Sequence, residues 1–233
     1  MAALTAPSTV AYPERSMMRN NSGQPRFDLF AQTAPGLEAV TAAELKGLEL
    51  KPHKEIGGVA FRGDLEQLYD ANLWLRTASR IVVRAGTFYA STFSELERRA
   101  RKIPWENFLP KDGPVRVRVT CRKSRLYHSD AVAERILSAI ARVAPRGVEL
   151  ADNGKSDDES SDETSERSGG QLFIVRIVSD QCEISADSSG DLLHRRGYRL
   201  DVAKAPLRET LAAAMVLASG WKAGTDLLDP LCG

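Results

Sequence analysis

The chain has 233 residues, with 32 basic and 31 acidic side chains and a net charge of +1. This length can bury a core without disulfides or a structural metal, and it fits one large or two small domains. No apolar run reaches the roughly 18 residues of a membrane span, so we expect no membrane partner. Cys121, Cys182 and Cys232 form no C-x-x-C pair. A structural zinc site is therefore not expected, and Cys121 and Cys182 predict buried thiols in a reducing compartment.

The near-zero net charge hides an uneven distribution. Residues 151–170 hold seven acids against Lys155 and Arg167, a local net of −5, which leaves +6 for the rest of the chain. This segment is rich in Ser, Asp and Glu and nearly lacks apolar side chains, so it predicts a disordered surface insertion. A phosphorylation-controlled or partner-binding role for the insertion is the alternative.

Residues 1–25 lack hydrophobic periodicity and are rich in Pro, Ser, Asn and Gly, as is typical of a disordered lead-in. No apolar run of secretory type is present, so we expect a cytoplasmic protein. Arg15 and Arg19, against the single acid Glu14, leave an organellar transit peptide as the alternative.

From residue 26 onwards the pattern predicts a first domain over 26–90. Strands are expected at 27–33, near 48–54, near 58–62 and at 80–89. One helix follows Pro35 and Gly36. A second is capped by Asp64 and Gln67, with an apolar face that contains Leu65, Leu68, Tyr69 and Leu73. The order strand-helix-strand-strand-helix-strand is that of a ferredoxin-like domain.

A second domain is expected over 91–187. Thr92 and Glu95 predict a capping box and a helix over 93–102. The strand at 114–120 alternates, with its valines on one face and Arg116, Arg118 and Thr120 on the other, which we expect to be exposed. A helix follows Ser129 and Asp130, and its apolar residues recur at helical spacing: Val132, Ile136, Ile140 and Val143. The apolar run 172–178 predicts a strand buried on both faces, paired with 181–186 across a turn at 179–180. The fold class is therefore mixed α/β (α+β).

A basic and aromatic cluster is the first candidate binding feature. Five cations lie within ten residues, and Tyr127 and His128 follow at once; the cations are Arg116, Arg118, Arg122, Lys123 and Arg125. Such a patch suits a phosphate backbone, and the rings could stack on unpaired bases. The alternative is an ordinary solvated strand face.

The second candidate is residues 194–199, the sequence HRRGYR. Three arginines, Arg195, Arg196 and Arg199, lie with His194 and Tyr198 around Gly197, which allows a sharp turn. A basic linker is the alternative reading.

The C-terminal part predicts a helix that opens at Pro206 and ends at Gly220, with Leu207, Leu211, Met215 and Ala218 on one face. Residues 226–229 (DLLD) predict a short buried strand, and D-P-L-C-G follows. A strand that runs into a turn with Pro and Gly is typical of nucleotide sites in α/β sheets.

Three stretches together resemble the THUMP-domain RNA methyltransferases, and in particular the bacterial-type 23S rRNA guanine-N2 methyltransferases. They are CRKSRLYHSDAVAERI (121–136), LHRRGYRLDVAKAPLRETLAAAMVLASGW (193–221) and LLDPLCG (227–233). The resemblance implies a ferredoxin-like domain and a THUMP domain that bind RNA. It also implies the first helix and strand of a Rossmann-type methyltransferase domain over 188–233.

The resemblance also implies the functional residues. Asp229, Pro230, Cys232 and Gly233 would begin the S-adenosylmethionine loop, and the basic residues of both candidate segments would bind RNA. The family's catalytic Asn/Asp-Pro-Pro-aromatic motif is absent from these residues, so we expect no catalytic residue and no activity from this chain alone. The partner implied is RNA, specifically 23S rRNA, and no DNA.

Two alternatives stay open. A stand-alone THUMP RNA-binding module would bind structured RNA without catalysis, and a native stop codon after Gly233 would favour it. A THUMP-type thiolation enzyme would use a different nucleotide loop, and the D-P-L-C-G motif favours methyl transfer over it.

Overall fold

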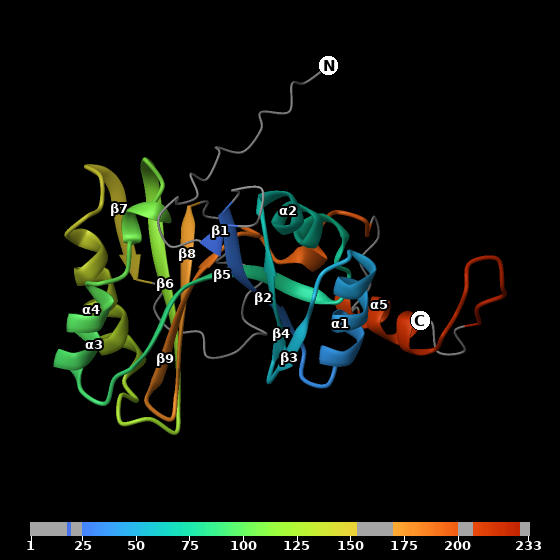
Figure 1. Ribbon diagram of the computed structural model, residues 1–233, viewed down its shortest axis with the longest axis horizontal. Coiled ribbons are helices and arrows are strands. Elements are labelled where there is room, and N and C mark those ends of the chain that lie inside the picture. Colours follow the sequence, from blue (N-terminus) through green and yellow to red (C-terminus); the bar gives the residue numbers. More distant parts are fainter. Residues whose placement is uncertain (1–17, 20–24, 153–169, 200–206, 229–233) are drawn as a thin grey trace, which may run out of the picture. The chain divides into compact units, whose positions relative to one another are not determined.

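The computed structural model describes residues 18–19, 25–152, 170–199 and 207–228 (Figure 1). Contacts divide the chain into two compact units, which we describe separately. The ferredoxin-like unit comprises Asp28–Ile81 and Asp191–Gly233. The central unit comprises Val82–Gly190 together with the chain up to Phe27. Residues 153–169 of the acidic insertion and most of the lead-in lie outside the described residues.

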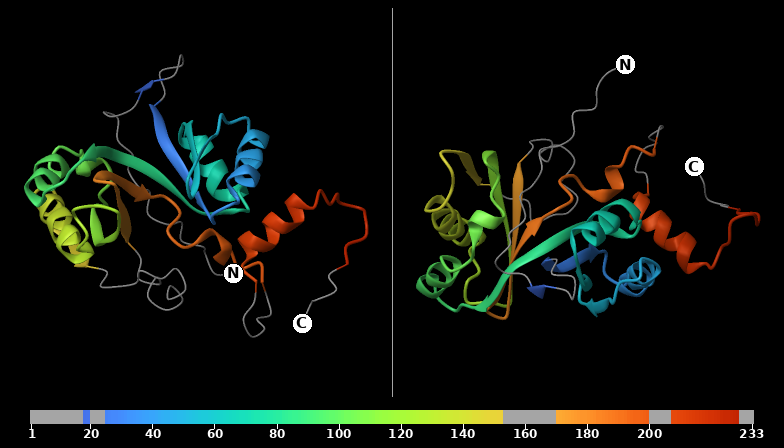
Figure 2. Two further views of the ribbon diagram at one scale, coloured as in Figure 1. Left: turned by 90° about the horizontal axis from the view of Figure 1, so that it is seen from below. Right: turned by 45° about the horizontal axis from the view of Figure 1, so that its top comes forward.

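The ferredoxin-like unit has the expected element order. Its strands follow the order β3-β4-β2-β5, and helices α1 and α2 both contact β4 (Figure 2). The elements are β2 (Pro25–Thr33), α1 (Glu38–Gly47), β3 (His53–Glu55), β4 (Gly58–Gly63), α2 (Leu65–Trp74) and β5 (Ala78–Tyr89). The predicted ferredoxin-like arrangement is thus confirmed.

Two details of this unit differ from the sequence prediction. The strand expected near 48–54 begins only at His53, because Glu49 adopts a left-handed φ of 61° and the Leu50 N–H bonds back to the Leu45 carbonyl. The capping box of Asp64 and Gln67 is present. However, of the apolar face predicted for α2 only Leu68 is buried. The side chains of Leu65, Tyr69 and Leu73 are exposed.

The central unit is a mixed sheet with two helices. Its strand order is β5-β9-β8-β6-β7, where β6 pairs in parallel with β7 and β8, and β9 pairs antiparallel with β8 and β5. The elements are α3 (Phe93–Ala100), η1 (Trp105–Asn107), β6 (Asp112–Arg122), α4 (Ser129–Ala141), β7 (Gly147–Asp152), β8 (Gln171–Val178) and β9 (Gln181–Asp187). Strand β5 contributes Val82–Tyr89 to this sheet.

The core of the central unit forms between this sheet and the helices α3 and α4, which lie side by side (Figure 1). Val132, Ile136 and Ile140 of α4 are fully buried, as their helical spacing predicts. Trp105 is buried edge-on against Phe173, with ring centroids 5.1 Å apart. Val143, which the sequence places on the same face as Ile140, is exposed because it lies beyond the end of α4.

The helix cap at Thr92 differs in one bond from the capping box that the sequence predicts. The Thr92 hydroxyl accepts from the Glu95 N–H, but the Glu95 carboxylate accepts from the N–H and hydroxyl of Ser91 instead of from the Thr92 N–H. These hydrogen bonds lower the pKa of Glu95 below its ordinary value. Helix α3 still begins where the pattern predicts.

Candidate nucleic-acid interface

Strand β6 carries the first basic residues, and one of them is not where the sequence places it. Val115, Val117 and Val119 are buried on one face, as predicted. Arg116 is only 8% exposed, so the expectation of an exposed Arg116 is wrong, and Arg118 is half-buried. The reason is that β6 is an inner strand. Arg116 is in register with buried Leu172 of β8, so both faces of the sheet are covered there.

The loop after β6, residues 122–128, is the basic loop. The side chains of Arg122, Lys123, Arg125, Tyr127 and His128 are all exposed, whereas Leu126 is 2% exposed and is buried in the unit. One buried leucine therefore fixes the middle of the loop while its cations and rings project outwards. This is the arrangement that phosphate binding requires.

Asp180 anchors the basic loop. Its carboxylate Oδ1 accepts hydrogen bonds from the Ser124 hydroxyl at 2.6 Å and from the Arg125 backbone N–H at 2.7 Å. Oδ2 accepts from the Tyr89 hydroxyl at 3.3 Å. Because three donors converge on one carboxylate, the turn between β8 and β9 holds the loop after β6.

The electrostatics of this anchor follow from those bonds. The hydrogen bond from the Ser124 hydroxyl has the largest effect, followed by the bond from the Arg125 N–H, and together they lower the pKa of Asp180 below its ordinary value of 3.8. The charge of Arg125 acts in the same direction. Asp180 is therefore ionised at neutral pH, and it stabilises the loop backbone while the guanidinium of Arg125 remains exposed.

Two rings end the basic loop. The centroids of Tyr127 and His128 lie 4.0 Å apart with the planes tilted by 41°, and Tyr127 is 70% exposed. A ring that is exposed to this extent, next to three cations, offers a face on which an unpaired base can stack.

The second predicted segment, HRRGYR, lies in the ferredoxin-like unit. Gly197 has φ 77°, which confirms the predicted sharp turn. The Arg196 guanidinium donates to the Asn72 carbonyl at 2.6 Å, and Arg199 donates to the Leu207 carbonyl at 2.7 Å. Tyr198 is 75% exposed, whereas His194 and Arg195 are half-buried.

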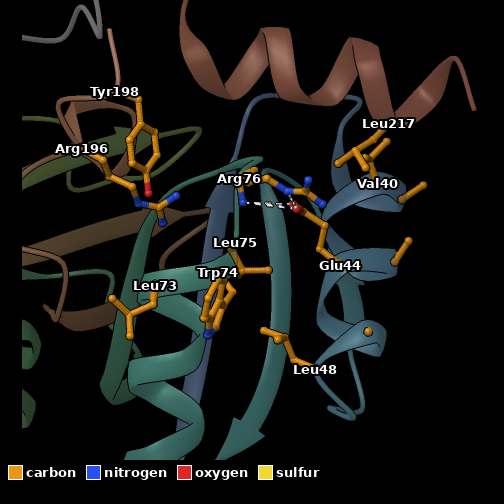
Figure 3. Close-up of a pocket in the computed structure, with 13 residues that line it drawn as sticks. Val40, Glu44, Leu48, Leu73, Trp74, Leu75, Arg76, Arg196, Tyr198 and Leu217 are labelled. Carbon is orange, nitrogen blue, oxygen red and sulfur yellow. Dashed lines mark hydrogen bonds and ion pairs between the residues drawn. The ribbon is translucent and has the colours of Figure 1, made fainter. Parts of the chain in front are cut away.

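Arg196 and Tyr198 also line a pocket of about 880 Å³ in this unit (Figure 3). In it, Arg76 lies against Glu44, with an Nε to Oε1 distance of 3.0 Å. The remaining wall is mostly apolar and comes from α1, the end of α2 and helix α5 (Glu209–Ala218). Its residues include Val40, Leu48, Leu73, Trp74, Leu75 and Leu217.

The C-terminal predictions meet the structure only in part. Helix α5 (Glu209–Ala218) buries Thr210 and Ala214, while Met215 of the predicted face is 63% exposed. Gly220, with φ 72°, ends the helix as predicted. The predicted start at Pro206 lies outside the described residues.

The strand and loop that should follow α5 are not seen as expected. Residues 226–228 are not a strand, and Leu227 and Leu228 are exposed, because none of the described strands pairs with them. Asp229, Pro230, Cys232 and Gly233 lie outside the described residues. No described side chain therefore tests the fit of S-adenosylmethionine.

Sequence reasoning missed the anchor formed by Asp180, Ser124 and Tyr89. The left-handed turn at Ser179 and Asp180 is visible in the sequence only as a short connection between two strands. The signal that could have indicated the anchor is the aspartate in this turn. It becomes informative only when the pairing of β6 with β8 is known, because that pairing brings the turn to the basic loop.

Two further findings concern other kinds of site. Burial raises the pKa of Cys182 to about 12, which makes its thiol inert, and Cys121 is half-buried rather than buried. In the part of the chain that the structure describes, no helix is long and apolar enough to cross a membrane.

Three domain families match this chain. The RlmL ferredoxin-like domain matches residues 28–82, the THUMP domain matches 90–152, and the RMKL-like methyltransferase domain matches 196–233. The fold and the family matches show an RlmL-type ferredoxin-like domain, then a THUMP domain, then a segment that matches the RMKL-like methyltransferase domain. The chain is thus similar to the THUMP-domain methyltransferases.

Relatives agree with this assignment but are longer. YpsC of Bacillus subtilis, named provisionally as an RNA methyltransferase, is 36% identical over 89% of this chain and 52% of its own length. The ribosomal RNA large subunit methyltransferase K/L of Syntrophotalea carbinolica is 38% identical over 88% of this chain and 28% of its own length. The chain thus spans about half the length of YpsC and less of the K/L protein.

Solved structures show the same fold. A Listeria monocytogenes protein described as a predicted N6-adenine-specific DNA methylase has a TM-score of 0.71 at 35% identity, over 84% of this chain and 49% of its own. SMU.472, named provisionally as a methyltransferase and solved with SAH, has a TM-score of 0.68 at 33% identity, over the same shares. The descriptions of these relatives name both RNA and DNA, so they do not decide the substrate.

Proposed function

We propose that this chain is the RNA-binding part of an S-adenosylmethionine-dependent rRNA methyltransferase, and that the basic loop is its principal RNA contact. The observation that carries the proposal is the exposed set of cations and rings in residues 122–128, held by Asp180 within a THUMP domain. The finer activity that we propose is guanine-N2 methylation of 23S rRNA. The domain limits proposed are 26–90, 91–187 and 188–233.

We propose a role for each group in the loop. Arg122, Lys123 and Arg125 would bind phosphates, because their charged ends are exposed while the backbone is fixed. Tyr127 and His128 would stack on unpaired bases. Such contacts position RNA without reading much of its sequence, which suits a binding domain that delivers a substrate.

The ferredoxin-like unit would guide RNA in a lesser way. Tyr198 is exposed and Arg195 is half-buried, whereas the guanidinium groups of Arg196 and Arg199 already donate to backbone carbonyls. We also propose weaker phosphate contacts for Arg116 and Arg118, because the side chain of Arg116 is buried and that of Arg118 is half-buried.

The cofactor proposal rests on relatives and on residues 229–233. S-adenosylmethionine supplies the methyl group in enzymes of this class, and SMU.472 was solved with SAH. Asp229, Pro230, Cys232 and Gly233 would begin the loop that holds it. We propose that the catalytic motif lies outside these 233 residues, that the chain alone does not transfer a methyl group, and that it acts in the cytoplasm.

The test of RNA binding uses the 233-residue chain. We expect it to bind a fragment of 23S rRNA, measured by fluorescence anisotropy, with an affinity that falls steeply as salt rises, and to bind duplex DNA of the same length more weakly. Equal binding to both nucleic acids would contradict the RNA assignment, and so would salt-insensitive binding.

The test of the reaction adds S-adenosylmethionine with a labelled methyl group. We expect no labelled RNA from the 233-residue chain, and N2-methylguanosine in digested rRNA when the same region is expressed with a longer reading frame. A sulfur-containing nucleoside would favour thiolation instead, and a native stop after Gly233 would favour the stand-alone binding module.

A further inference from the structure

The central unit contains a second basic feature, a cavity of about 460 Å³ between β5 and the end of α3. Its wall comprises residues 85–88 of β5, Arg98 and Arg99 of α3, and residues 102–104. Three cations, Arg98, Arg99 and Lys102, line it, and no acidic residue does. None of these residues belongs to the basic loop or to the HRRGYR segment.

Arg99 is the informative member of this set. Its Nε atom is buried and has no hydrogen-bond partner among the described residues. A buried donor without an acceptor is unfavourable, and native proteins satisfy nearly all such groups with protein, water or ligand. A cavity beside this arginine provides room for an acceptor that the chain itself does not supply.

The acids of α3 are engaged elsewhere. The Glu95 carboxylate accepts from the N–H and hydroxyl of Ser91 and acts on Arg99 only through its charge. The Glu97 carboxylate forms ion pairs with Arg101 and with Arg135. Neither carboxylate lines the cavity, so its three cations give it a positive character.

The fold sets the shape of the cavity through Gly86. A Cβ at this position would lie 3.2 Å from Cδ1 of Ile103, which is 7% exposed, so Ile103 would have to shift by a few tenths of an ångström if another residue replaced Gly86. The pairing of β5 with β9 also shifts its register between Arg84 and Gly86. Ile103 follows Lys102 directly, so this packing fixes the cationic wall beside the strand.

We propose that this cavity binds a phosphate group of the RNA backbone, as a second contact point in addition to the basic loop. Arginine suits the role because its planar fork donates two hydrogen bonds to a phosphate, and here Nε is the donor without a partner. Basic residues in the last turn of a helix also stabilise its dipole, but that role requires neither a cavity nor a buried Nε. The inference rests on the RNA binding proposed above.

The first test needs no RNA. The Nε–H signals of arginine are followed by nitrogen-15 NMR while inorganic phosphate is added to the 233-residue chain, with sodium chloride at equal ionic strength as the control. The Arg99 signal is identified by its absence in Arg99→Lys, which keeps the charge but lacks the guanidinium. We expect phosphate, and not chloride, to shift the Arg99 signal. No shift, or the same shift with chloride, would overturn the proposal.

The second test measures the dependence of RNA affinity on salt. The variant Arg99→Gln with Lys102→Gln should reduce the slope of log affinity against log salt by about 0.7 to 0.9, because one phosphate contact is lost. The matched control, Arg101→Gln with Arg142→Gln, removes the same charge from exposed residues outside the cavity and should leave the slope nearly unchanged. Circular dichroism of both variants checks that they fold.

The outcomes separate this proposal from the proposed function. Equal slope changes in the two double variants would show a general charge effect and overturn the cavity site. If phosphate shifts the Arg99 NMR signal but the Arg99 and Lys102 variant leaves the salt dependence of RNA affinity unchanged, the cavity is an adventitious anion site only. That result would overturn its assignment as an RNA contact. Failure of the wild-type chain to bind RNA, with the phosphate shift intact, would count against the proposed function and not against anion binding.

Discussion

The basic loop and the HRRGYR segment have similar compositions but use their arginines differently. In the basic loop, Asp180 holds the Ser124 hydroxyl and the Arg125 backbone N–H, so the anchoring bonds leave the guanidinium groups exposed. In the HRRGYR segment, the guanidinium groups of Arg196 and Arg199 themselves donate to backbone carbonyls. A count of basic residues cannot distinguish these two cases.

This difference predicts that arginines of the basic loop contribute mainly to RNA affinity, whereas Arg196 and Arg199 contribute mainly to folding stability. An arginine that is anchored through its backbone can keep its charged end for a phosphate. An arginine that satisfies a carbonyl loses that partner if it turns towards a ligand, and a partly buried acceptor is costly to leave unpaired. The predictions below test this contrast in order of expected size.

The largest effect is expected from neutralising the basic loop. Arg122→Gln, Lys123→Gln and Arg125→Gln together should lower the slope of log affinity against log salt by about 2.1 to 2.7, since three phosphate contacts are lost. Fluorescence anisotropy over a salt series measures it. The matched control is Arg195→Gln, Arg196→Gln and Arg199→Gln. The contrast fails if this control loses as much of the slope.

The next largest effect concerns stacking. Tyr127→Ala should weaken binding to single-stranded RNA by about 1–3 kcal/mol, or roughly 5- to 150-fold, because one base loses its aromatic platform. Titration of a short single-stranded RNA measures it. Tyr69→Ala, which removes an exposed ring on α2, is the control, and an equal loss there would contradict a specific role for Tyr127.

A smaller effect, on stability rather than binding, is expected at Arg196. Arg196→Met should destabilise the chain by about 1 kcal/mol, because the Asn72 carbonyl loses a charge-assisted hydrogen bond. Urea denaturation measures it. Arg122→Met changes an exposed side chain and should stay within about 0.5 kcal/mol of the wild type. Equal destabilisation by both would erase the contrast.

The smallest effect is a pH dependence at Asp180. Its folded pKa lies below 3.8, so its contribution to stability is present above that value and is lost as the pH falls through the folded pKa. Asp180→Asn should therefore be less stable than the wild type at neutral pH, and the gap should narrow below about pH 4. Urea denaturation from pH 7 to pH 3 measures this. A gap that does not change with pH would show that the charge plays no part.

Local patterns predicted much of the fold. The alternation of Val115, Val117 and Val119 and the helical spacing of Val132 and Ile136 identified buried faces correctly. The alternation and the helical spacing each describe one strand or one helix. An apolar face on that element is enough to show which side of it faces the core. The order of the elements then gave the ferredoxin-like arrangement.

Features that depend on a second element could not be read in this way. Arg116 is buried because its strand lies between two others, and Met215 is exposed because α5 packs through the small residues Thr210 and Ala214. The anchor at Asp180 joins residues that are more than fifty positions apart. Each of these requires the strand register or the packing partner, which no local window of the sequence contains.

The turn that carries Asp180 has a consequence for how this domain can change. Ser179 and Asp180 both have positive φ, 50° and 63°, as in the two-residue hairpins that favour Asn-Gly or Asp-Gly. Asp180→Gly would relieve the backbone at this turn and also remove the carboxylate that holds the basic loop. Glycine here would therefore gain an easier turn but lose the hydrogen bonds to Ser124 and Arg125, so the aspartate keeps the basic loop fixed at the expense of a strained backbone.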